Sequence, residues 1–308
     1  MKLAIVFPGQ GSQAVGMMSA YGESAVIHKT FDEASAAVGR DLWQLVGEGP
    51  AEALTQTVNT QPVMLAAGVA VYRAWLEKGG SQPVFLAGHS LGEYTALVAA
   101  GALSFADAVP LVQFRAQAMQ EAVPQGVGAM AAILGLDDDL IRAACAESAQ
   151  GEVVEPVNFN GVGQTVIAGH ASAVARASEA AKARGAKRAV MLPVSAPFHC
   201  SLMAPAAARL RERLAEITVS RPTIPVVHNV DVVCYDDPAA IKDALVRQAC
   251  SPVRWVETVR FLAGQGATHL FEAGPGKVLA GLTKRIEASL QGAALSDAAS
   301  LEQALAAG

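Results

Sequence analysis

Residues 83–97 read PVFLAGHSLGEYTAL, and this stretch constrains how the surrounding chain can fold. An apolar run, Val84–Ala87, leads into Gly88-His89-Ser90-Leu91-Gly92, and a helix-forming run follows. The order strand, tight turn and helix is the context that a G-x-S-x-G nucleophile elbow requires. The two glycines permit the sharp turn and let the strand and the helix approach closely. The stretch therefore predicts an α/β fold in which Ser90 is lifted above the sheet.

Ser90 is the candidate nucleophile of that turn. A turn of this kind places the hydroxyl near a helix N-terminus, where N–H groups and the helix dipole stabilise a developing oxyanion. We therefore expect acyl chemistry through a covalent serine ester. The five-residue pattern alone leaves another interpretation open, in which the segment is only a Gly-Ser turn that leads into a core helix.

The rest of the chain alternates strand-like and helix-like runs, which predicts a mainly parallel sheet with helices on its faces. The expected strands are 3–7, 84–87, 226–230 and 268–272, and the expected helices are 23–38, 61–78, 92–102, 106–121, 205–216, 239–248, 256–263 and 278–288. We assign residues 1–124 and 195–308 to one large α/β domain. Its Ala-rich end, 291–308, is weakly specified.

A different order interrupts this pattern after the Pro- and Gly-containing segment 124–128. The expected elements there are strand 129–134, helix 138–149, strands 153–159 and 164–168, helix 172–184 and strand 188–192. The order β-α-β-β-α-β is the split βαβ, or ferredoxin-like, arrangement. We therefore predict that residues 125–194 form a small ferredoxin-like domain inserted into the large one.

Composition and charge exclude several classes of function. Of the 308 residues, 52% are hydrophobic, enough for a large core, and the net charge of −5 offers no basic face to nucleic acid. The apolar runs are shorter than the roughly 18 residues that span a membrane, and Leu3–Phe7 is too short for a signal peptide. Four cysteines without a C-x-x-C pair indicate neither a zinc site nor a disulfide scaffold. We expect a cytoplasmic protein.

A serine nucleophile needs a base within hydrogen-bond reach, and the chain has six histidines. His199 lies where the chain re-enters the large domain, in a loop of the kind that often carries catalytic groups. His89 adjoins Ser90, but its side chain should leave the turn in another direction. The others are expected in or beside surface helices or as satisfied residues in strands: His28, His170, His228 and His269. Position alone leaves the role of His199 open.

A glycine loop follows the first expected strand. Its residues 9–14, GQGSQA, match the dinucleotide fingerprint G-x-G-x-x-[GA], and Asp32 lies about 20 residues further on. We reject a dinucleotide site, because the fingerprint needs the acid at the end of a second strand, whereas 25–38 looks helical. The better interpretation is a loop at the carboxyl edge of the sheet that aims the Gln10 N–H at Ser90. A plain turn remains the alternative.

Arg115 lies on the expected helix 106–121, which carries few charges. A lone arginine on an apolar helix often pairs with a local acid, here Glu121 or Asp107. The alternative is a guanidinium that faces the cleft and grips a carboxylate through two hydrogen bonds.

Several motifs occur together in a fixed order along nearly the whole chain. They are Phe7–Gln13, Thr60–Pro62, Gly88–Tyr94, Phe114–Met119, Gly128–Ala132, Val166–Gly169, Pro197–His199 and Gly274–Gly276. Together they resemble the malonyl-CoA:acyl carrier protein transacylases of bacterial fatty-acid synthesis, to which acyltransferase domains of polyketide synthases are similar. The resemblance implies an α/β-hydrolase-like large domain, and no catalytic position departs from the family pattern.

The resemblance also implies roles for residues at matching positions. Ser90 corresponds to the nucleophile and His199 to its base, and Gln248 resembles the glutamine that supports His199 in place of a triad acid. The N–H groups of Gln10 and Leu91 are implied to form the oxyanion hole. The implied substrate-binding residues are Arg115, which would hold the malonyl carboxylate, Phe198, which resembles the residue of malonyl-selective members, and Gln61.

The implied reaction has two steps: Ser90 takes malonyl from coenzyme A, and the phosphopantetheine thiol of acyl carrier protein then takes it from Ser90. The resemblance implies no cofactor, and the expected partners are malonyl-CoA and acyl carrier protein, with no nucleic acid and no membrane. A basic group could meet an acidic carrier protein, although a solvated helix face is the simpler interpretation: Lys182, Arg184, Lys187 and Arg188. The sequence gives no signal for oligomers, and a monomer is expected.

Three alternatives stay open. A serine esterase or thioesterase would share Ser90 and His199 but would need no cationic clamp and would pass the acyl group to water. A non-enzymatic module that binds carrier proteins would not need those two residues intact. A close relative that serves polyketide synthesis or malonate decarboxylation would use the same chemistry with another partner.

Overall fold

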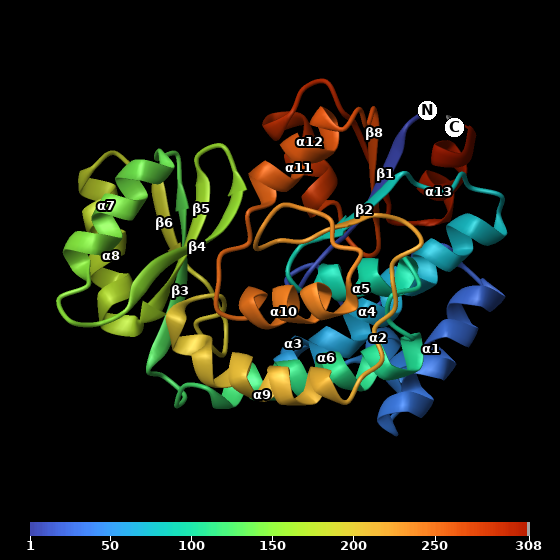
Figure 1. Cartoon of the computed structure of the whole chain (residues 1–308), viewed down its shortest axis with the longest axis horizontal. Helices are drawn as coiled ribbons and strands as arrows, with labels where there is room; N and C mark the ends of the chain where they lie inside the picture. The colour runs from blue at the N-terminus through green and yellow to red at the C-terminus, as the bar shows by residue number, and fades with distance from the viewer. Residues whose placement is uncertain (307–308) are drawn as a thin grey trace.

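The computed structural model describes residues 1–306 and contains two separate sheets (Figure 1). The larger sheet has the strand order β7-β2-β1-β8-β9, and every neighbouring pair in it is parallel. Its strands are β1 Leu3–Phe7, β2 Phe85–Gly88, β7 Val226–Val227, β8 His269–Ala273 and β9 Gln291–Leu295. The predicted parallel sheet is therefore confirmed.

The smaller sheet is antiparallel, with the strand order β4-β5-β3-β6. It contains β3 Gly128–Leu134, β4 Val154–Gly161, β5 Gln164–His170 and β6 Arg188–Met191, with helices α7 Asp138–Ser148 and α8 Ala171–Ala183 along one side (Figure 1). Because β5 lies between β3 and β4, the order is that of a split βαβ unit. The expected α/β fold with a small second sheet is confirmed, whereas the domain limits at 125 and 194 stay a prediction.

The helices of the large unit lie around the parallel sheet. They are α1 Ala25–Val38, α2 Leu42–Glu48, α3 Ala51–Thr55, α4 Thr57–Glu77, α5 Leu91–Ala99, α6 Phe105–Glu121, α9 Ala204–Ala215, α10 Pro238–Gln248, α11 Trp255–Gly264, α12 Val278–Ile286 and α13 Ala298–Ala306. Figure 1 shows α11 and α12 between the two sheets, with α9 and α10 reaching toward the small one. Each expected helix is present, with ends shifted by a few residues.

Strand β1 shows why the sheet is covered on both faces. All five of its side chains are buried, as in parallel sheets that have helices on each side. Leu3, Ile5 and Phe7 pack in the apolar cluster that includes α1, α4 and α6. The alternating residues Ala4 and Val6 pack in a second cluster with α11 and α12. The period of two along the strand thus builds two cores.

Several strands and helices begin or end at residues other than the expected ones, because of tertiary contacts. The strand expected over 226–230 stops at Val227, because the chain turns back there through hydrogen bonds between His228 and residues 232 and 233. Helix α4 begins at Thr57 rather than near residue 61, because the Asn59 and Thr60 side chains bond the carbonyls of Ala53 and Leu54.

The end of the chain forms more regular structure than its sequence indicates. The weakly specified segment 291–308 contains β9, which pairs with β8, and helix α13, although residues 307 and 308 lie outside the described part. Two short helices before α4, α2 and α3, were not expected either. Their sequences lack a long apolar periodicity, so packing against larger elements decides their conformation.

The contact between β2 and α5 is the tightest feature of the fold near the elbow. A Cβ atom placed on Gly88 would lie 1.9 Å from the backbone carbon of Gly92, and one on Gly92 would lie 2.1 Å from the carbonyl oxygen of Phe7. Only glycine fits such approaches, so the expectation that both glycines allow close packing is confirmed. The contact holds α5 directly behind the ends of β1 and β2.

Replacing Gly92 by alanine should destabilise the protein, because the added methyl group meets backbone that side-chain rotation cannot move. We expect Gly92→Ala to lower the free energy of unfolding by about 3 kcal/mol. The matched control is Gly281→Ala on α12, where an added Cβ meets nothing within 4 Å. That control should stabilise by about 0.5–1 kcal/mol. Urea unfolding measures both, and equal stabilities would contradict the packing argument.

Candidate active site

A cavity of about 490 Å³ opens at the carboxyl ends of β1 and β2, between the two sheets. Seven of the eight residues expected to form the site line it: Gln10, Gln61, Ser90, Leu91, Arg115, Phe198 and His199. The eighth, Gln248, is fully buried directly behind it. The small sheet contributes the facing wall through Met130, Asn158, Asn160 and Val166. The fold therefore brings together residues that are far apart in the sequence.

Ser90 has the geometry of an activated nucleophile. Its φ of 52° and ψ of −105° lie in a region that residues with a Cβ rarely adopt, at the residue directly before α5. This strained turn directs the hydroxyl toward His199, whose Nε2 lies 2.7 Å from the Ser90 Oγ. His199 itself has a φ of 67°. Strain of this kind persists only where the surrounding structure enforces it, and it concentrates at functional sites.

The backbone carbonyl of Gln248 orients the His199 ring. His199 Nδ1 lies 2.9 Å from this oxygen, which can only accept a hydrogen bond. Nδ1 therefore carries the proton, and Nε2 has a free lone pair that accepts from the Ser90 hydroxyl. The expected supporting role of Gln248 thus falls to its backbone. Its side chain points elsewhere, toward Arg115, Glu93 and the Ser90 carbonyl.

The surroundings of His199 favour its neutral form. Burial is the main cause that lowers the pKa of His199, to about 3, and the positive charge of Arg115 adds to it. The hydrogen bond to Gln248 acts in the opposite direction. A base with a lowered pKa is unprotonated at neutral pH, so the ring is ready to accept the serine proton.

Arg115 points into the site with a buried guanidinium. It is 2% exposed and donates to Gln61 Oε1 at 2.9 Å, Gln248 Oε1 at 3.0 Å and Ser90 Oγ at 3.1 Å. All three acceptors are neutral oxygens. Burial lowers the pKa of Arg115, yet a guanidinium stays charged in proteins. A buried cation held by neutral groups at the cavity wall is suited to an anionic ligand.

The local acids do not pair with Arg115. Glu121 pairs with Arg209 at 2.6 Å, and Asp107 accepts the Ser104 hydroxyl at the start of α6. Of the two interpretations that the sequence left open, the geometry supports the guanidinium that faces the cleft. Gln61 reaches the cavity through α4 and positions this guanidinium, while Phe198 forms part of the wall beside His199.

Two backbone N–H groups beside Ser90 are available to a ligand. Within residues 1–306, neither the Gln10 N–H nor the Leu91 N–H donates to another group of the chain, and both residues line the cavity. Leu91 is the first residue of α5, where the helix dipole adds to its donor strength. The Ser90 N–H is already bonded, to Asn229 Oδ1 at 2.8 Å. This arrangement suits an oxyanion hole built from Gln10 and Leu91.

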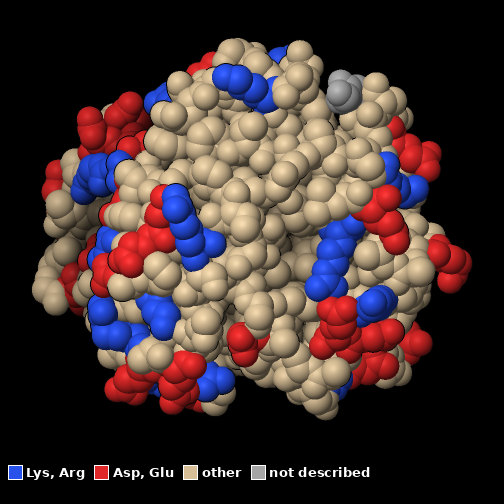
Figure 2. Space-filling view, turned by 45° about the vertical axis from the view of Figure 1, so that its right-hand side comes forward, with Lys and Arg blue, Asp and Glu red and all other residues tan. Residues whose placement is uncertain are grey.

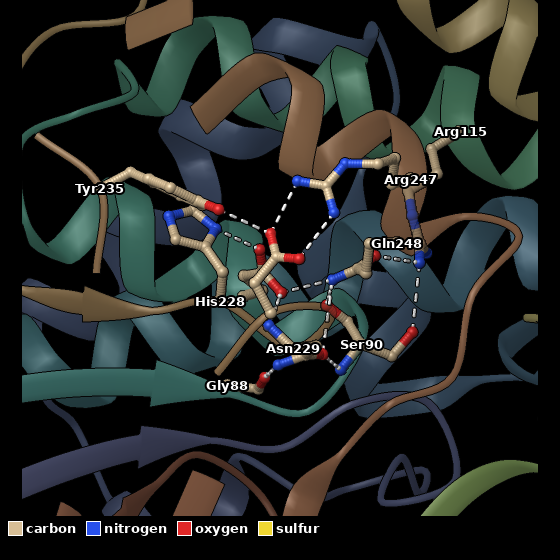
Figure 3. A network of polar contacts seen from close by, with 10 residues as sticks. Gly88, Ser90, Arg115, His228, Asn229, Tyr235, Arg247 and Gln248 are labelled. Atoms are coloured by element: carbon tan, nitrogen blue, oxygen red, sulfur yellow. Dashed lines mark hydrogen bonds and ion pairs between the residues drawn. The ribbon is translucent and has the colours of Figure 1, made fainter. Parts of the chain in front are cut away.

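A buried polar network under the elbow was not predicted from the sequence (Figure 3). Glu93, in the first turn of α5, accepts from His228 Nδ1 at 2.7 Å, from the Asn229 N–H at 3.0 Å and from Gln248 Nε2 at 2.8 Å. His228 was expected as a satisfied strand residue, but it lies just after β7 and forms this buried pair. A carboxylate at an apolar helix position is the one sequence signal that could have indicated the network.

The His89 side chain bonds neither Ser90 nor His199, which agrees with the expectation that it leaves the elbow in another direction. Its Nε2 lies 2.7 Å from Asn160 Oδ1 on β4, so it joins the two sheets across the cavity. Asp32 lies on α1 and not at the end of a strand, which agrees with the rejection of a dinucleotide site.

The surface in Figure 2 offers no continuous basic area on that face, where Lys and Arg alternate with Asp and Glu around a broad uncharged centre. In the part of the chain that the structure describes, every helix is too short or too polar to cross a membrane. Within the same residues, no group of His, Cys, Asp and Glu could hold a metal ion.

Known proteins match this chain over almost its whole length. The acyl transferase domain family matches residues 4–295. The malonyl CoA-acyl carrier protein transacylase of Salmonella typhimurium is 59% identical over 305 residues, covering 99% of both chains. The Bacillus subtilis enzyme of the same name is 46% identical and covers 99% of this chain and 96% of its own.

Solved structures agree with these relatives. The acyl-carrier-protein S-malonyltransferase of Burkholderia pseudomallei superposes with a TM-score of 0.98 at 62% identity, covering 99% of this chain and 100% of its own. A malonyl-transacylase solved in complex with its type II PKS acyl-carrier protein superposes with a TM-score of 0.99 at 54% identity, covering 100% of both chains.

The neutral state of His199 can be tested by NMR. Because the pKa of His199 is lowered to about 3, its ring signals should not titrate between about pH 8 and 5. His199→Gln identifies the signal. A His199 midpoint near the ordinary value of about 6.5 would contradict the assigned environment.

Proposed function

The chain belongs to the acyl transferase family and is a malonyl-CoA:acyl carrier protein S-malonyltransferase, and from this premise we propose that Ser90 carries the malonyl group between the two substrates. The observation that carries the proposal is the contact of 2.7 Å between Ser90 Oγ and His199 Nε2, beside two free N–H groups and a buried arginine. Ser90 Oγ contacts both the base and the guanidinium, and the two N–H groups belong to residues that line the same cavity.

In the first step, Ser90 Oγ attacks the thioester carbonyl of malonyl-CoA. His199 Nε2 takes the hydroxyl proton as the new C–O bond forms. The carbonyl oxygen becomes negatively charged and accepts hydrogen bonds from the N–H groups of Gln10 and Leu91. The C–S bond then breaks, coenzyme A leaves as its thiol with the proton from His199, and the malonyl ester of Ser90 remains.

In the second step, the phosphopantetheine thiol of acyl carrier protein enters the same cavity. It gives its proton to His199 Nε2 while the sulfur attacks the ester carbonyl. The oxyanion uses the same two N–H groups, and the proton returns to Ser90 Oγ as the C–O bond breaks. Because the imidazole alternates between base and acid, the backbone carbonyl of Gln248 has to hold one ring orientation through both steps.

Arg115 selects the acyl group. When the malonyl group binds, its carboxylate accepts hydrogen bonds from the Arg115 guanidinium, which Gln61 and Gln248 hold in place. Phe198, next to His199, narrows the cavity where a branched acyl group would have to lie. The acceptor pathway that we propose is fatty-acid synthesis. The monomeric state and the cytoplasmic location expected from the sequence stay predictions.

Intact-protein mass spectrometry tests the acyl-serine directly. We expect brief mixing with malonyl-CoA to add one malonyl group to the protein and none to Ser90→Ala. Acyl carrier protein with its phosphopantetheine arm should remove the group and gain its mass. An adduct that water alone removes at the same rate would indicate a thioesterase, and no adduct would refute the proposed role of Ser90.

Arg115→Ala should reduce malonyl transfer and improve acetyl transfer. An unpaired buried malonate carboxylate costs about 2–5 kcal/mol, so kcat/KM for malonyl-CoA should fall by at least about 30-fold. Acetyl-CoA carries no carboxylate and should be accepted better than by the unchanged protein. Arg213→Ala, which removes a half-buried arginine on α9 that pairs with Glu216 and does not line the cavity, is the matched control and should change neither rate. An equal loss with both donors would contradict the role of Arg115.

A further inference from the structure

The strained conformation of Ser90 raises the question of what holds it. Its φ of 52° is unfavourable for any residue with a Cβ atom, so contacts around the residue have to maintain it. Two backbone groups of the elbow point away from the cavity, the Gly88 carbonyl and the Ser90 N–H. Both bond the side chain of one residue, Asn229.

The two contacts of Asn229 form a clamp across the elbow (Figure 3). Asn229 Nδ2 donates to the Gly88 carbonyl oxygen at 2.7 Å, and Asn229 Oδ1 accepts from the Ser90 N–H at 2.8 Å. A primary amide offers a donor and an acceptor in this spacing, whereas an ionised carboxylate offers only acceptors. Because the two backbone groups lie on either side of His89, the clamp fixes the peptide planes that determine where Ser90 Oγ points.

Asn229 is itself held firmly. Its side chain is fully buried, and its backbone N–H donates to the Glu93 carboxylate at 3.0 Å. Glu93 is also fully buried and accepts from Gln248 Nε2, which in turn donates to the Ser90 carbonyl oxygen at 3.0 Å. The chain turns back directly after β7, and this turn brings Asn229 under the elbow.

The Glu93 carboxylate also fixes the orientation of the Gln248 amide. An ionised carboxylate only accepts hydrogen bonds, so it selects the NH₂ end of Gln248. The oxygen end then faces Arg115, which needs an acceptor. The Glu93 carboxylate thus connects Asn229, which bonds the turn at Ser90, with Gln248, which bonds the Arg115 guanidinium.

We propose that Asn229 is a positioning residue for the nucleophile: its side-chain amide clamps Gly88 and Ser90 and so maintains the strained elbow from which Ser90 reacts. The proposal rests on the proposed acyl-serine function. Asn229 does not line the cavity, so it should affect the rate of acylation much more than the binding of malonyl-CoA.

Rapid-quench mass spectrometry of the malonyl adduct measures this effect in the full-length protein. For Asn229→Ala we expect the acylation rate at saturating malonyl-CoA to fall about 100-fold, since a displacement of about 1 Å can cost that much. The concentration for half-maximal rate should change less than about threefold. The matched control is Asn59→Ala, which removes another buried asparagine, bonded to Arg40 and to the Ala53 carbonyl of α3. It should keep the acylation rate within about threefold even if it lowers Tm similarly.

Asn229→Asp gives a second readout that a merely structural residue would not produce. The introduced carboxylate can accept from the Ser90 N–H but cannot donate to the Gly88 carbonyl. When protonated, its O–H restores that donor, and burial beside Glu93 should raise its pKa. The acylation rate of this variant relative to the unchanged protein should therefore rise as the pH falls from about 8 to 6, by up to about tenfold per pH unit. The ratio reports what the introduced carboxyl adds, including its coupling to Glu93 and His228. The other ionisable groups near the elbow are present in both proteins: His89, Arg115 and His199.

The outcomes separate this inference from the proposed function. If the unchanged protein forms no adduct, the acyl-serine mechanism itself fails. If it forms the adduct and Asn229→Ala does so equally fast, or no more slowly than Asn59→Ala, the clamp is refuted. If Asn229→Ala does not fold, the pH dependence of Asn229→Asp decides, and a flat ratio overturns the proposal.

Discussion

The close contact of β2 with α5 at Gly88 and Gly92 is the constraint on which the rest of the active site depends. It forces the chain to turn within a few residues, so Ser90 takes a positive φ and its hydroxyl leaves the sheet at the carboxyl edge. Because β1 is the parallel neighbour of β2, the loop that follows β1 begins at the same edge of the sheet and carries the Gln10 N–H there. The positions of the proposed nucleophile and of the proposed oxyanion donors therefore depend on the strand order and on two glycines.

The charges of the site suit the anionic acyl group that we propose it binds. Arg115 is a buried cation held by neutral oxygens, His199 is kept neutral by its burial and by that cation, and the one buried carboxylate nearby, Glu93, is occupied by His228, Asn229 and Gln248. Because His199 is neutral and Arg115 donates to neutral oxygens, the cavity wall carries a positive charge. In the proposed mechanism, this positive charge is what distinguishes a malonyl group from an acetyl group.

Residues close to the elbow were predictable, whereas the support beneath it was not. The turn, the parallel sheet and the split βαβ unit follow from apolar runs and glycine positions, because burial on both faces leaves a continuous signal in the sequence. Asn229 and His228 fell inside an expected strand, 226–230, and only the reversal after Val227 turns Asn229 toward the elbow. Gln248 contacts His199 through its backbone carbonyl, while its side chain contacts Arg115 and the Ser90 carbonyl, and spacing along the chain does not distinguish these two uses.

The sequence by itself determined the fold class, the position of the candidate nucleophile and, through the resemblance, the set of other candidate residues. These depend on local chemistry, since a glycine-flanked serine between a strand and a helix has few other conformations. Only the tertiary structure decided that Arg115 pairs with neither Glu121 nor Asp107. It also decided that Gln248 contacts His199 through its backbone carbonyl, and that one buried carboxylate joins three segments distant in sequence. The physical reason is that hydrogen-bond partners of buried polar groups are selected by packing between elements, and spacing along the chain carries no record of that choice.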